Sequence, residues 1–389
     1  MLSEESLELI VQDHLAELEW QAGHGPDFAP GSGERDTWND IVLRGRLRNA
    51  VRNLNPDVPE EYLDQAIGEV ITPKSQSAIA ENRRIHQILV EGYRGIEYID
   101  HEGNVQNPTI YFLSSQPHKN DYLSLNQVTI ANLDGERRFD VVCYVNGMPL
   151  AFIELKKTGA NTSVEGAYNQ LQTYVQEFGM AFRFANIVIP SDDISAKYGT
   201  PFTPWNHFAP WNVDEDGSPV DPNNMVVAGE PVTQLDLLLD GLFNVERFGQ
   251  LYSDFTAFDD TAEGLVMRIA KPHQYFAVTK AVGSTITAAR GDKRAGVIWH
   301  TTGAGKSMEM ELYTAKIMRR PEMLSPTVIV LNDRTELDEQ LFETFNRSTI
   351  LPEAPRNIES RAELRELLSQ KTSGGIYFST LQKFGLNGK

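Results

Sequence analysis

The feature that most constrains the fold is a pair of apolar stretches, 139–145 and 150–155, joined through an Asn-Gly pair at 146–147. Asn-Gly between two strand-like runs is a strong short-range signal for a hairpin, because both residues tolerate the positive φ of a tight turn. Further strand-like stretches precede the hairpin, and a short apolar one follows at 184–190. Between them, apolar residues at helical spacing predict a helix at about 163–178. We therefore expect an α/β fold with a sheet flanked by helices.

The register of this hairpin decides which side chains meet. A plain two-residue loop would set Asp140 opposite Ile153 and would turn Asp140 and Glu154 to opposite faces of the sheet. One additional residue, in a longer loop or in a bulge favoured by Pro149, would instead set Asp140 opposite Glu154. We predict the longer loop or the bulge, which puts Asp140, Glu154 and Lys156 on one face.

These three side chains have a chemical use together. Two neighbouring carboxylates repel each other unless a divalent cation neutralises them, and Mg²⁺ prefers oxygen ligands of this kind. Lys156 could orient a water molecule or stabilise charge on an attacked phosphate. Gln170 and Tyr174 lie four residues apart, so they share one face of the following helix. The pattern favours a nuclease site with Asp140 and Glu154 as metal ligands over a hydrated edge strand of alternating charge.

A second motif, "VIWHTTGAGKSMEMEL", consists of an apolar stretch, a glycine-rich loop and the start of an amphipathic helix. This order is typical of a phosphate-binding loop, in which backbone N–H groups and a helix N-terminus hold phosphates, Lys306 reaches the outer phosphates and Ser307 binds Mg²⁺. His300 stands where the usual motif has its first glycine; the alternative is a glycine-rich turn with a solvated lysine. The predicted nucleotide-binding residues are Thr302, Gly303, Ala304, Gly305, Lys306 and Ser307.

Strands and helices alternate after about residue 295, which predicts a parallel sheet around this loop. Upstream, Gln274 in "KPHQYFAV" could read an edge of adenine, and a surface turn explains the stretch equally well. A working nucleotide hydrolase of this kind also needs acidic residues at the end of a later strand. No apolar strand that ends in Asp-Glu follows the loop before Lys389. We expect weak nucleotide binding at best, and no ATP hydrolysis.

Length, charge and cysteine content limit the class of protein. The chain of 389 residues suits two or three domains, has no apolar run long enough to span a membrane, and begins with acidic rather than basic residues. Its single cysteine, Cys143, excludes an intrachain disulfide, so we expect a cytoplasmic protein without membrane contact. The formal net charge of −19 argues against nonspecific nucleic-acid binding by the chain as a whole. A nucleic-acid function therefore needs local basic patches or a partner subunit.

The chain resembles the restriction (R, or HsdR) subunit of type I restriction–modification enzymes over nearly its whole length. The stretches that carry the resemblance are "RRFDVVCYVNGMPLAFIELKK", "AYNQLQTY", "VIWHTTGAGKS" and "VLNDRTELDEQL". The resemblance implies a PD-(D/E)xK endonuclease domain with N-terminal helices at 1–255 and part of a RecA-like helicase or translocase domain, without its acidic motif, at 256–389. A full R subunit continues beyond these parts, so the sequence looks like an N-terminal fragment.

The resemblance also implies roles for individual residues. These are metal binding for Asp140 and Glu154, catalysis for Lys156, an accessory role for Gln170 and Tyr174, and ATP binding with Mg²⁺ for the loop from Thr302 to Ser307. The stretch "LELIVQDHLAELEW" is similar to the family's opening helix, where Glu8 falls at an acidic position near the nuclease site. A surface carboxylate on an amphipathic helix is the more common case for such a residue.

The activity that the resemblance implies is ATP-driven movement of double-stranded DNA followed by endonuclease cleavage. The implied partners are the modification (methyltransferase) subunit and the specificity subunit, which recognises the DNA. One alternative is a DNA-repair nuclease–helicase, in which the nuclease usually follows the motor rather than preceding it. Another is a noncatalytic assembly or nucleotide-binding module with vestigial sites, against which the intact Glu154/Lys156 and Lys306/Ser307 pairs count.

Overall fold

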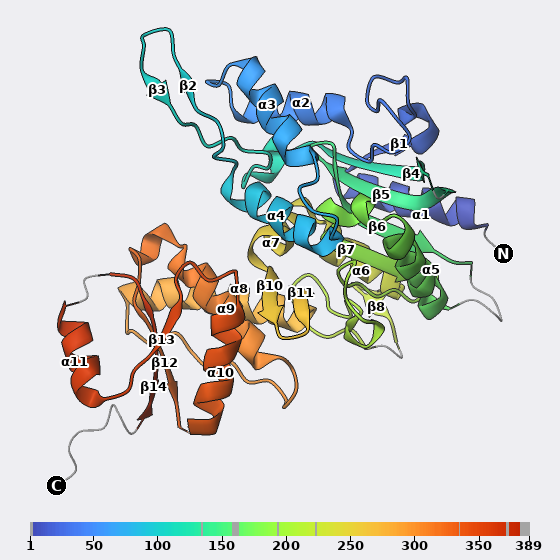
Figure 1. Ribbon diagram of the computed structural model, residues 1–389. Coiled ribbons are helices and arrows are strands. Elements are labelled where there is room, and N and C mark those ends of the chain that lie inside the picture. The colour runs from blue at the N-terminus through green and yellow to red at the C-terminus, as the bar shows by residue number, and fades with distance from the viewer. Residues whose placement is uncertain are drawn as a thin grey trace. The chain divides into compact units, whose positions relative to one another are not determined.

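The computed structural model describes residues 3–133, 135–157, 163–192, 194–221, 224–333, 335–370 and 373–381. The chain divides into two units, Met1–Ser253 and Asp254–Lys389 (Figure 1). The helices of the first unit are α1 (Glu4–Glu17), α2 (Arg44–Leu54), α3 (Glu60–Ile71), α4 (Ala78–Glu91), α5 (Val164–Glu177), α6 (Gln234–Phe243) and α7 (Val245–Asp254). Its main strands are β1 (Gln21–His24), β4 (Tyr122–Asn132), β5 (Gly135–Val145), β6 (Met148–Leu155) and β7 (Ile187–Ser191). Two short ribbons complete it, β2 (Tyr98–Ile99) with β3 (Val105–Gln106) and β8 (Val226–Val227) with β9 (Glu230–Pro231).

A five-stranded mixed sheet organises the first unit, in the order β1-β4-β5-β6-β7. The central pairs β4–β5 and β5–β6 are antiparallel, whereas β1–β4 and β6–β7 are parallel. Every residue of β6 is buried, which explains why this strand reads as an apolar run that Glu154 alone interrupts. Helix α5 packs against β6 and β7, and α1 contacts β4, β5 and β6 (Figure 1). The predicted α/β sheet with flanking helices is confirmed.

The hairpin between β5 and β6 has the bulge that the sequence predicts. The turn itself has two residues, Asn146 and Gly147, with φ of 51° and 77°. The paired residues are Val145 with Met148, Tyr144 with Pro149, Cys143 with Ala151 and Val141 with Ile153. Leu150 is thus the extra residue, and the register, continued by one step, sets Asp140 opposite Glu154.

Local signals in the sequence account for the helices around this sheet. Ser3 is a residue type that favours the N-cap, and it caps α1: its hydroxyl accepts a hydrogen bond from the backbone N–H of Ser6. Ser163 caps α5 in the same way. Behind the sheet, the indole of Trp20 packs edge-on against Tyr122 and two phenylalanines and donates to the carbonyl of Phe243. The packing of Trp20, which follows α1, helps to fix where the side chains of α1 meet the strands.

Several predicted boundaries differ from the structure. The amphipathic sequence over 58–84 predicts one helix, but the structure has two, α3 and α4, because Pro73 cannot continue a helix. The sequence over 234–255 also predicts one helix and forms two, α6 and α7. The strand-like stretch 109–114 contributes only an isolated bridge between Tyr93 and Ile110. These differences leave the central sheet unchanged.

The second unit contains a three-stranded parallel sheet in the order β12-β14-β13, preceded by an antiparallel hairpin of β10 and β11. Its strands are β10 (Thr256–Thr261), β11 (Gly264–Ile269), β12 (Val328–Asn332), β13 (Pro355–Asn357) and β14 (Ile376–Thr380). Its helices are α8 (Pro272–Arg290), α9 (Lys306–Met318), α10 (Thr335–Arg347) and α11 (Arg361–Gln370). The predicted parallel sheet is confirmed. Residues 295–300 do not form the strand that the sequence predicts. Val297 and Trp299 are 93% and 86% exposed.

Across the described ranges of both units, we find no helix with the length and apolar character needed to cross a bilayer.

Candidate functional site

Asp140, Glu154 and Lys156 lie together at one end of the β5–β6 pair. The Glu154 side chain is 1% exposed, and its Oε1 lies 2.9 Å from the Lys156 Nζ. The Oδ2 of Asp140 accepts a hydrogen bond from the backbone N–H of Leu155, at 2.8 Å. Strand β6 therefore positions all three side chains, through Glu154 itself, through the backbone next to it, and through Lys156 just beyond its end.

Too little positive charge lies near Asp140 and Glu154 to balance both carboxylates. Burial and the nearby Asp140 raise the pKa of Glu154 to about 8, even though Lys156 acts in the opposite direction. Burial also raises the pKa of Asp140. For Lys156, burial lowers the pKa, but attraction to Glu154 and Asp140 outweighs it, so that the net shift is upward. A buried pair of carboxylates with one lysine is an environment that an additional cation would stabilise.

Simple alternation along the strand does not explain how Asp140 reaches this place. Its neighbour Phe139 packs edge-on against Phe152, which shares a face of β6 with Glu154. The register sets Asp140 opposite Glu154, as one common face requires, but Phe139 departs from strict alternation. The backbone is irregular here, since Gln127, on the neighbouring strand, has a φ of 53°. The Asp140 carboxylate instead reaches Glu154 by turning toward the backbone of β6.

Glu8 on α1 is buried, with 2% of its surface exposed, which excludes the alternative of a surface carboxylate. Its Oε2 accepts a hydrogen bond from the side-chain amide of Asn126 at 3.3 Å. Burial and repulsion from Asp140 raise the pKa of Glu8 to about 6. Glu8 is therefore close enough to Asp140 to belong to the same acidic group, as the resemblance implies.

Gln170 and Tyr174 meet on α5, where the Gln170 amide donates to the Tyr174 hydroxyl at 2.5 Å. Burial raises the pKa of Tyr174, and the charges of Glu154 and Asp140 raise it further. The ring of Tyr174 also packs edge-on against Phe139. Gln170 and Tyr174 thus share one face of α5, as their spacing predicts, and Tyr174 lies near enough to Glu154 and Asp140 for their charges to act on it.

Sequence reasoning missed three neighbours of these carboxylates. Asn126 bonds Glu8 and also lies 2.9 Å from a ring nitrogen of His24. Gln127 bonds Glu8 as well. Arg138 is exposed, and its charge partly opposes the rise in the pKa of Glu8 and of Asp140. Only Arg138 had a readable signal, its position two residues before Asp140; the other two depend on the pairing of β4 with β5.

The donor set fits a hard divalent cation. Asp140, Glu154 and Glu8 offer carboxylate oxygens, which Mg²⁺ and Mn²⁺ prefer, in a place where negative charge is in excess. These three carboxylates do not, however, lie mutually within 4.8 Å; in the part of the chain that the structure describes, another group of residues does so.

The phosphate loop in the second unit has the expected backbone. Gly303 and Gly305 both have a φ of 83°, and Gly305 is the N-cap of α9, which begins with Lys306. The Nζ of Lys306 donates to the carbonyls of His300 and Thr301 at 3.1 and 2.8 Å. Thr302, Ala304 and Ser307 complete the stretch, and Ser307 is exposed in the first turn of α9. The sequence thus places a helix N-terminus and a lysine at one loop.

Gln274 lies beside this loop rather than in a surface turn. It is 3% exposed, in the first turn of α8. Its side-chain oxygen accepts a hydrogen bond from the backbone N–H of Lys271, and its amide donates to the carbonyls of Ala304 and Gly305. Gln274 therefore ties α8 to the phosphate loop.

Family models match both parts of the chain. Residues 1–207 match the type I restriction enzyme R protein N terminus (HSDR_N), and residues 273–389 match the SWI2/SNF2 ATPase.

Curated relatives agree with these matches. The type I restriction enzyme HindI endonuclease subunit of Haemophilus influenzae is 34% identical over 397 residues, which cover 100% of this chain and 37% of the relative. The putative type I restriction enzyme MjaIXP endonuclease subunit of Methanocaldococcus jannaschii is 32% identical over 392 residues, 96% of this chain and 37% of the relative. The chain therefore spans little more than a third of the length of these two relatives. Because the HSDR_N model covers more than half of it, the chain belongs to the family of type I restriction enzyme R proteins.

Proposed function

We propose that the first unit is a metal-dependent DNA endonuclease domain of the PD-(D/E)xK type, with Asp140 and Glu154 as metal ligands and Lys156 as the catalytic lysine. The observation that carries the proposal is electrostatic. The Glu154 side chain is 1% exposed, burial and then the nearby Asp140 raise its pKa to about 8, and the Lys156 Nζ lies 2.9 Å from its Oε1. This arrangement is unfavourable for folding alone, and it is useful where a cation must be held against a phosphate.

A divalent cation held by Asp140 and Glu154 would act as a Lewis acid on the scissile phosphate and its attacking water. The chain's own residues would do the rest. The backbone N–H of Leu155 fixes one oxygen of Asp140, so that this carboxylate cannot rotate freely. Lys156, once the cation shares the charge of Glu154, can donate to a phosphate oxygen or orient the water.

The reaction that we propose is hydrolysis of a phosphodiester. The water oxygen forms a bond to phosphorus, the bond from phosphorus to the leaving sugar oxygen breaks, and that oxygen gains a proton. Gln170 and Tyr174 would orient groups around the carboxylates, because the Tyr174 hydroxyl lies in their field. Glu8 is an additional acidic residue of the same site.

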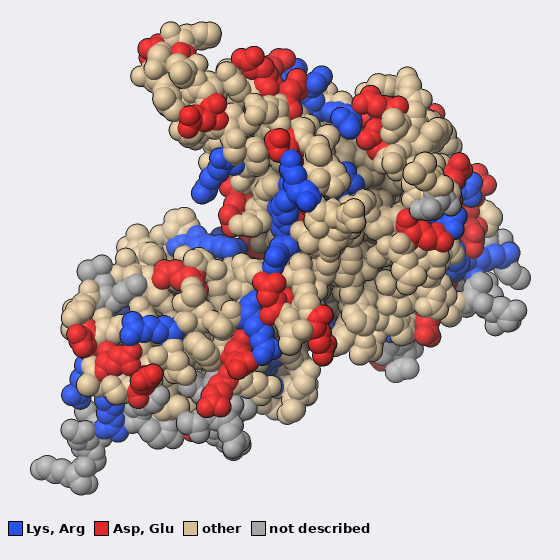
Figure 2. Space-filling view, viewed as in Figure 1, with Lys and Arg blue, Asp and Glu red and all other residues tan. Residues whose placement is uncertain are grey.

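For the second unit we propose ATP binding, with Mg²⁺, at the RecA-like phosphate loop from Thr302 to Ser307. The left-handed glycines and the helix N-terminus at Lys306 support this. The substrate would be double-stranded DNA, handled together with the modification and specificity subunits of a type I complex. The net charge of −19 favours such help in DNA binding, and Figure 2 shows basic side chains interspersed with acidic ones over the face in view.

The nuclease proposal is tested by Mn²⁺-dependent nicking of supercoiled plasmid. We expect Asp140→Asn and Lys156→Ala to lower the rate at least about 100-fold, since loss of one group that stabilises transition-state charge costs about 10²–10³. The matched controls are Asp64→Asn and Lys119→Ala, both exposed and on other elements. Equal nicking by wild type and by both site variants would rule out this assignment and favour a vestigial site.

A further inference from the structure

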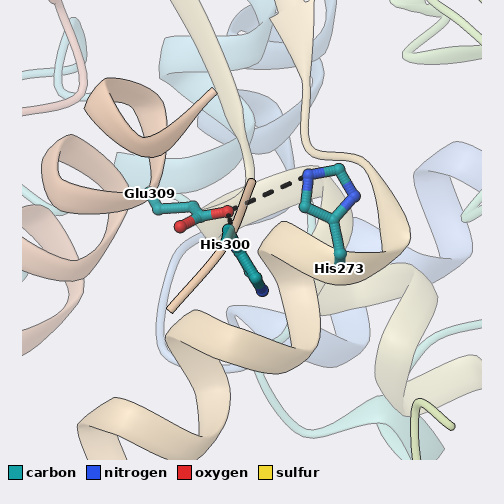
Figure 3. Close-up of side chains that lie close together, drawn as sticks. All are labelled: His273, His300 and Glu309. Atoms are coloured by element: carbon teal, nitrogen blue, oxygen red, sulfur yellow. Dashed lines mark hydrogen bonds and ion pairs between the residues drawn. The ribbon is translucent and has the colours of Figure 1, made fainter. Parts of the chain in front are cut away.

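A second group of metal-binding side chains lies in the second unit, separate from the proposed nuclease site. His273, His300 and Glu309 each offer one ligand atom, and these atoms all lie within 4.8 Å of one another. Among the residues that the structure describes, this is the group of three that meets such a spacing. Figure 3 shows both histidine side chains at the carboxylate end of Glu309, with dashed lines from the carboxylate to each.

The fold brings these residues together from three different segments. His273 lies in the first turn of α8, which the capping pair Lys271 and Gln274 holds in place. His300 directly precedes the phosphate loop, and Glu309 lies in the first turn of α9 after that loop. The three residues therefore join the beginning of α8, the entrance of the loop and the helix that follows it.

The contacts within the group are short and polar. Nδ1 of His300 lies 2.7 Å from Oε1 of Glu309, and Nε2 of His273 lies 3.9 Å from the same oxygen. The two ring centroids are 5.3 Å apart with an interplanar angle of 83°. Nε2 of His273 also lies 2.8 Å from the carbonyl oxygen of Ala304. Oε1 of Glu309 is thus hydrogen-bonded to one imidazole and lies within ion-pair distance of the other, whose Nε2 donates to the Ala304 carbonyl.

Exposure divides the group into a buried part and an open part. The Glu309 side chain is 4% exposed, whereas those of His300 and His273 are 25% and 38% exposed. A buried carboxylate needs a cation or strong donors near it. The solvent side of the two imidazoles gives an ion a route of entry to that carboxylate.

Two histidines with one glutamate are a ligand set of three-ligand zinc sites, which keep a further position open. Imidazole suits Zn²⁺, Ni²⁺ and Co²⁺, whereas Mg²⁺ prefers oxygen ligands. Ligand atoms about 2.0–2.2 Å from one ion lie roughly 3.3–3.6 Å apart in a tetrahedral site. The two distances of 2.7 and 3.9 Å lie on either side of this spacing, so small side-chain movements would bring both into range.

We propose that His273, His300 and Glu309 bind one transition-metal ion of the Zn²⁺ class, with an open position for water or an anionic ligand. The ion would crosslink α8 and α9 at the base of the phosphate loop. This site is independent of the nuclease proposal, and its ligand set differs from that of the Mg²⁺ that accompanies ATP. The competing explanation is a pair of plain hydrogen bonds without any ion, one between His300 and Glu309 and one from His273 to the Ala304 carbonyl.

The test is a titration of the whole chain with Co²⁺ and Zn²⁺ after removal of bound metal by a chelator. Excess Mg²⁺ is present throughout, so that sites built only from carboxylates are occupied. We expect one tight site per chain, with visible d–d absorption for Co²⁺ that Zn²⁺ displaces. His273→Ala and Glu309→Gln should weaken binding at least about tenfold, the loss that even an outer-shell change commonly causes.

The control is the double variant His101→Ala/His118→Ala, which removes two exposed histidines of the first unit and should bind like wild type. His273 is the most exposed of the three ligands, so its replacement is the variant least harmful to folding. A second readout, the rise in Tm caused by Zn²⁺, should be present in wild type and absent in both ligand variants. Wild type that binds no Co²⁺ in excess Mg²⁺, or ligand variants that bind it as wild type does, would overturn the proposal.

Discussion

At the scale of single residues, Glu154 gives the strongest support for a cation at the proposed nuclease site. It is a carboxylate at 1% exposure, next to Asp140, with one lysine to balance the charge. Burial of two acids with one base leaves the folded chain short of positive charge. This shortage of positive charge favours binding of a cation. Without a cation, it should make the free energy of unfolding depend on pH.

Stability in a chelator should fall as the pH rises, and Glu154→Gln should reduce that fall. The pKa of Glu154 is raised from 4.5 to about 8, so between these values the folded state binds more protons than the unfolded state. The free energy of unfolding therefore decreases with pH across this window. The effect of the variant should reach a few kcal/mol at pH ~8.5, since each pKa unit corresponds to about 1.4 kcal/mol, and should vanish near pH ~4.5.

This prediction is checked by urea unfolding at several pH values in EDTA, with the exposed Glu61→Gln as control. Saturating Mg²⁺ should flatten the wild-type curve, because a bound cation favours the charged carboxylates. Identical slopes for wild type and Glu154→Gln would show that Glu154 is not the group whose titration matters.

Arg138 is the residue that we expect to contact DNA next to the carboxylates. It is exposed, and it is close enough for its charge to oppose the rise in the pKa of Glu8 and of Asp140. Arg138→Ala should weaken DNA binding with little dependence on sequence and reduce the slope of log affinity against log salt by about 1. Fluorescence anisotropy measures this, with the exposed Arg94→Ala as control. An unchanged salt slope would remove Arg138 from the DNA-binding surface.

At the scale of elements, the β5–β6 turn sets the register on which the site depends. A Cβ on Gly147 would lie 2.4 Å from the carbonyl oxygen of Leu43 and 2.8 Å from the backbone nitrogen of Leu47. Asn146 is also fixed, since its side chain bonds the backbone of Phe112 and of Asp121. The turn therefore holds the start of α2 and the preceding loop as well as the hairpin.

Gly147→Ala should destabilise the chain more than Gly103→Ala does. Both glycines have a positive φ, 77° and 88°, so each variant should lose about 1–2 kcal/mol from left-handed backbone strain. A Cβ at Gly103 meets nothing within 4 Å, whereas at Gly147 it meets backbone atoms, which should add at least about 2 kcal/mol. Urea unfolding measures both losses. Equal losses would mean that the contact with α2 can relax.

The sequence predicts the elements whose cues are local. The Asn-Gly turn, the Ser3 cap and the i,i+4 pair of Gln170 and Tyr174 all rest on neighbours in the chain, and the structure contains each of them. The bulge was predictable because charge chemistry favours Asp140 opposite Glu154, although its position at Leu150 was not.

What the sequence does not predict depends on contacts between distant segments. Burial of Glu8 follows from how α1 packs on the sheet, and amphipathic spacing alone leaves its side chain on the surface. The apolar stretch 295–300 reads as a strand, but a strand exists only where another strand pairs with it. Within the described residues no strand pairs with this stretch. The proposed metal-binding group around Glu309 could not be predicted from the sequence, because its members come from three separate segments.

At the scale of the whole molecule, the two sites that we propose lie in different units of the structure. The first unit contains the carboxylates and Lys156, and the second contains the phosphate loop. The matches to an R protein N terminus and to an SNF2 ATPase follow the same division. The claim on which this account rests is that a divalent cation binds at Asp140 and Glu154.

That claim is tested most directly by locating the bound ion in the whole chain. Fe²⁺ replaces Mg²⁺, ascorbate and peroxide generate hydroxyl radicals at the ion, and mass spectrometry maps where the polypeptide is cut. If Asp140 and Glu154 bind the ion, cuts are expected near residues 140 and 154, and excess Mg²⁺ should suppress them and Asp140→Ala should abolish them. Absence of cuts near both residues, or the same cuts in Asp140→Ala, would contradict that claim.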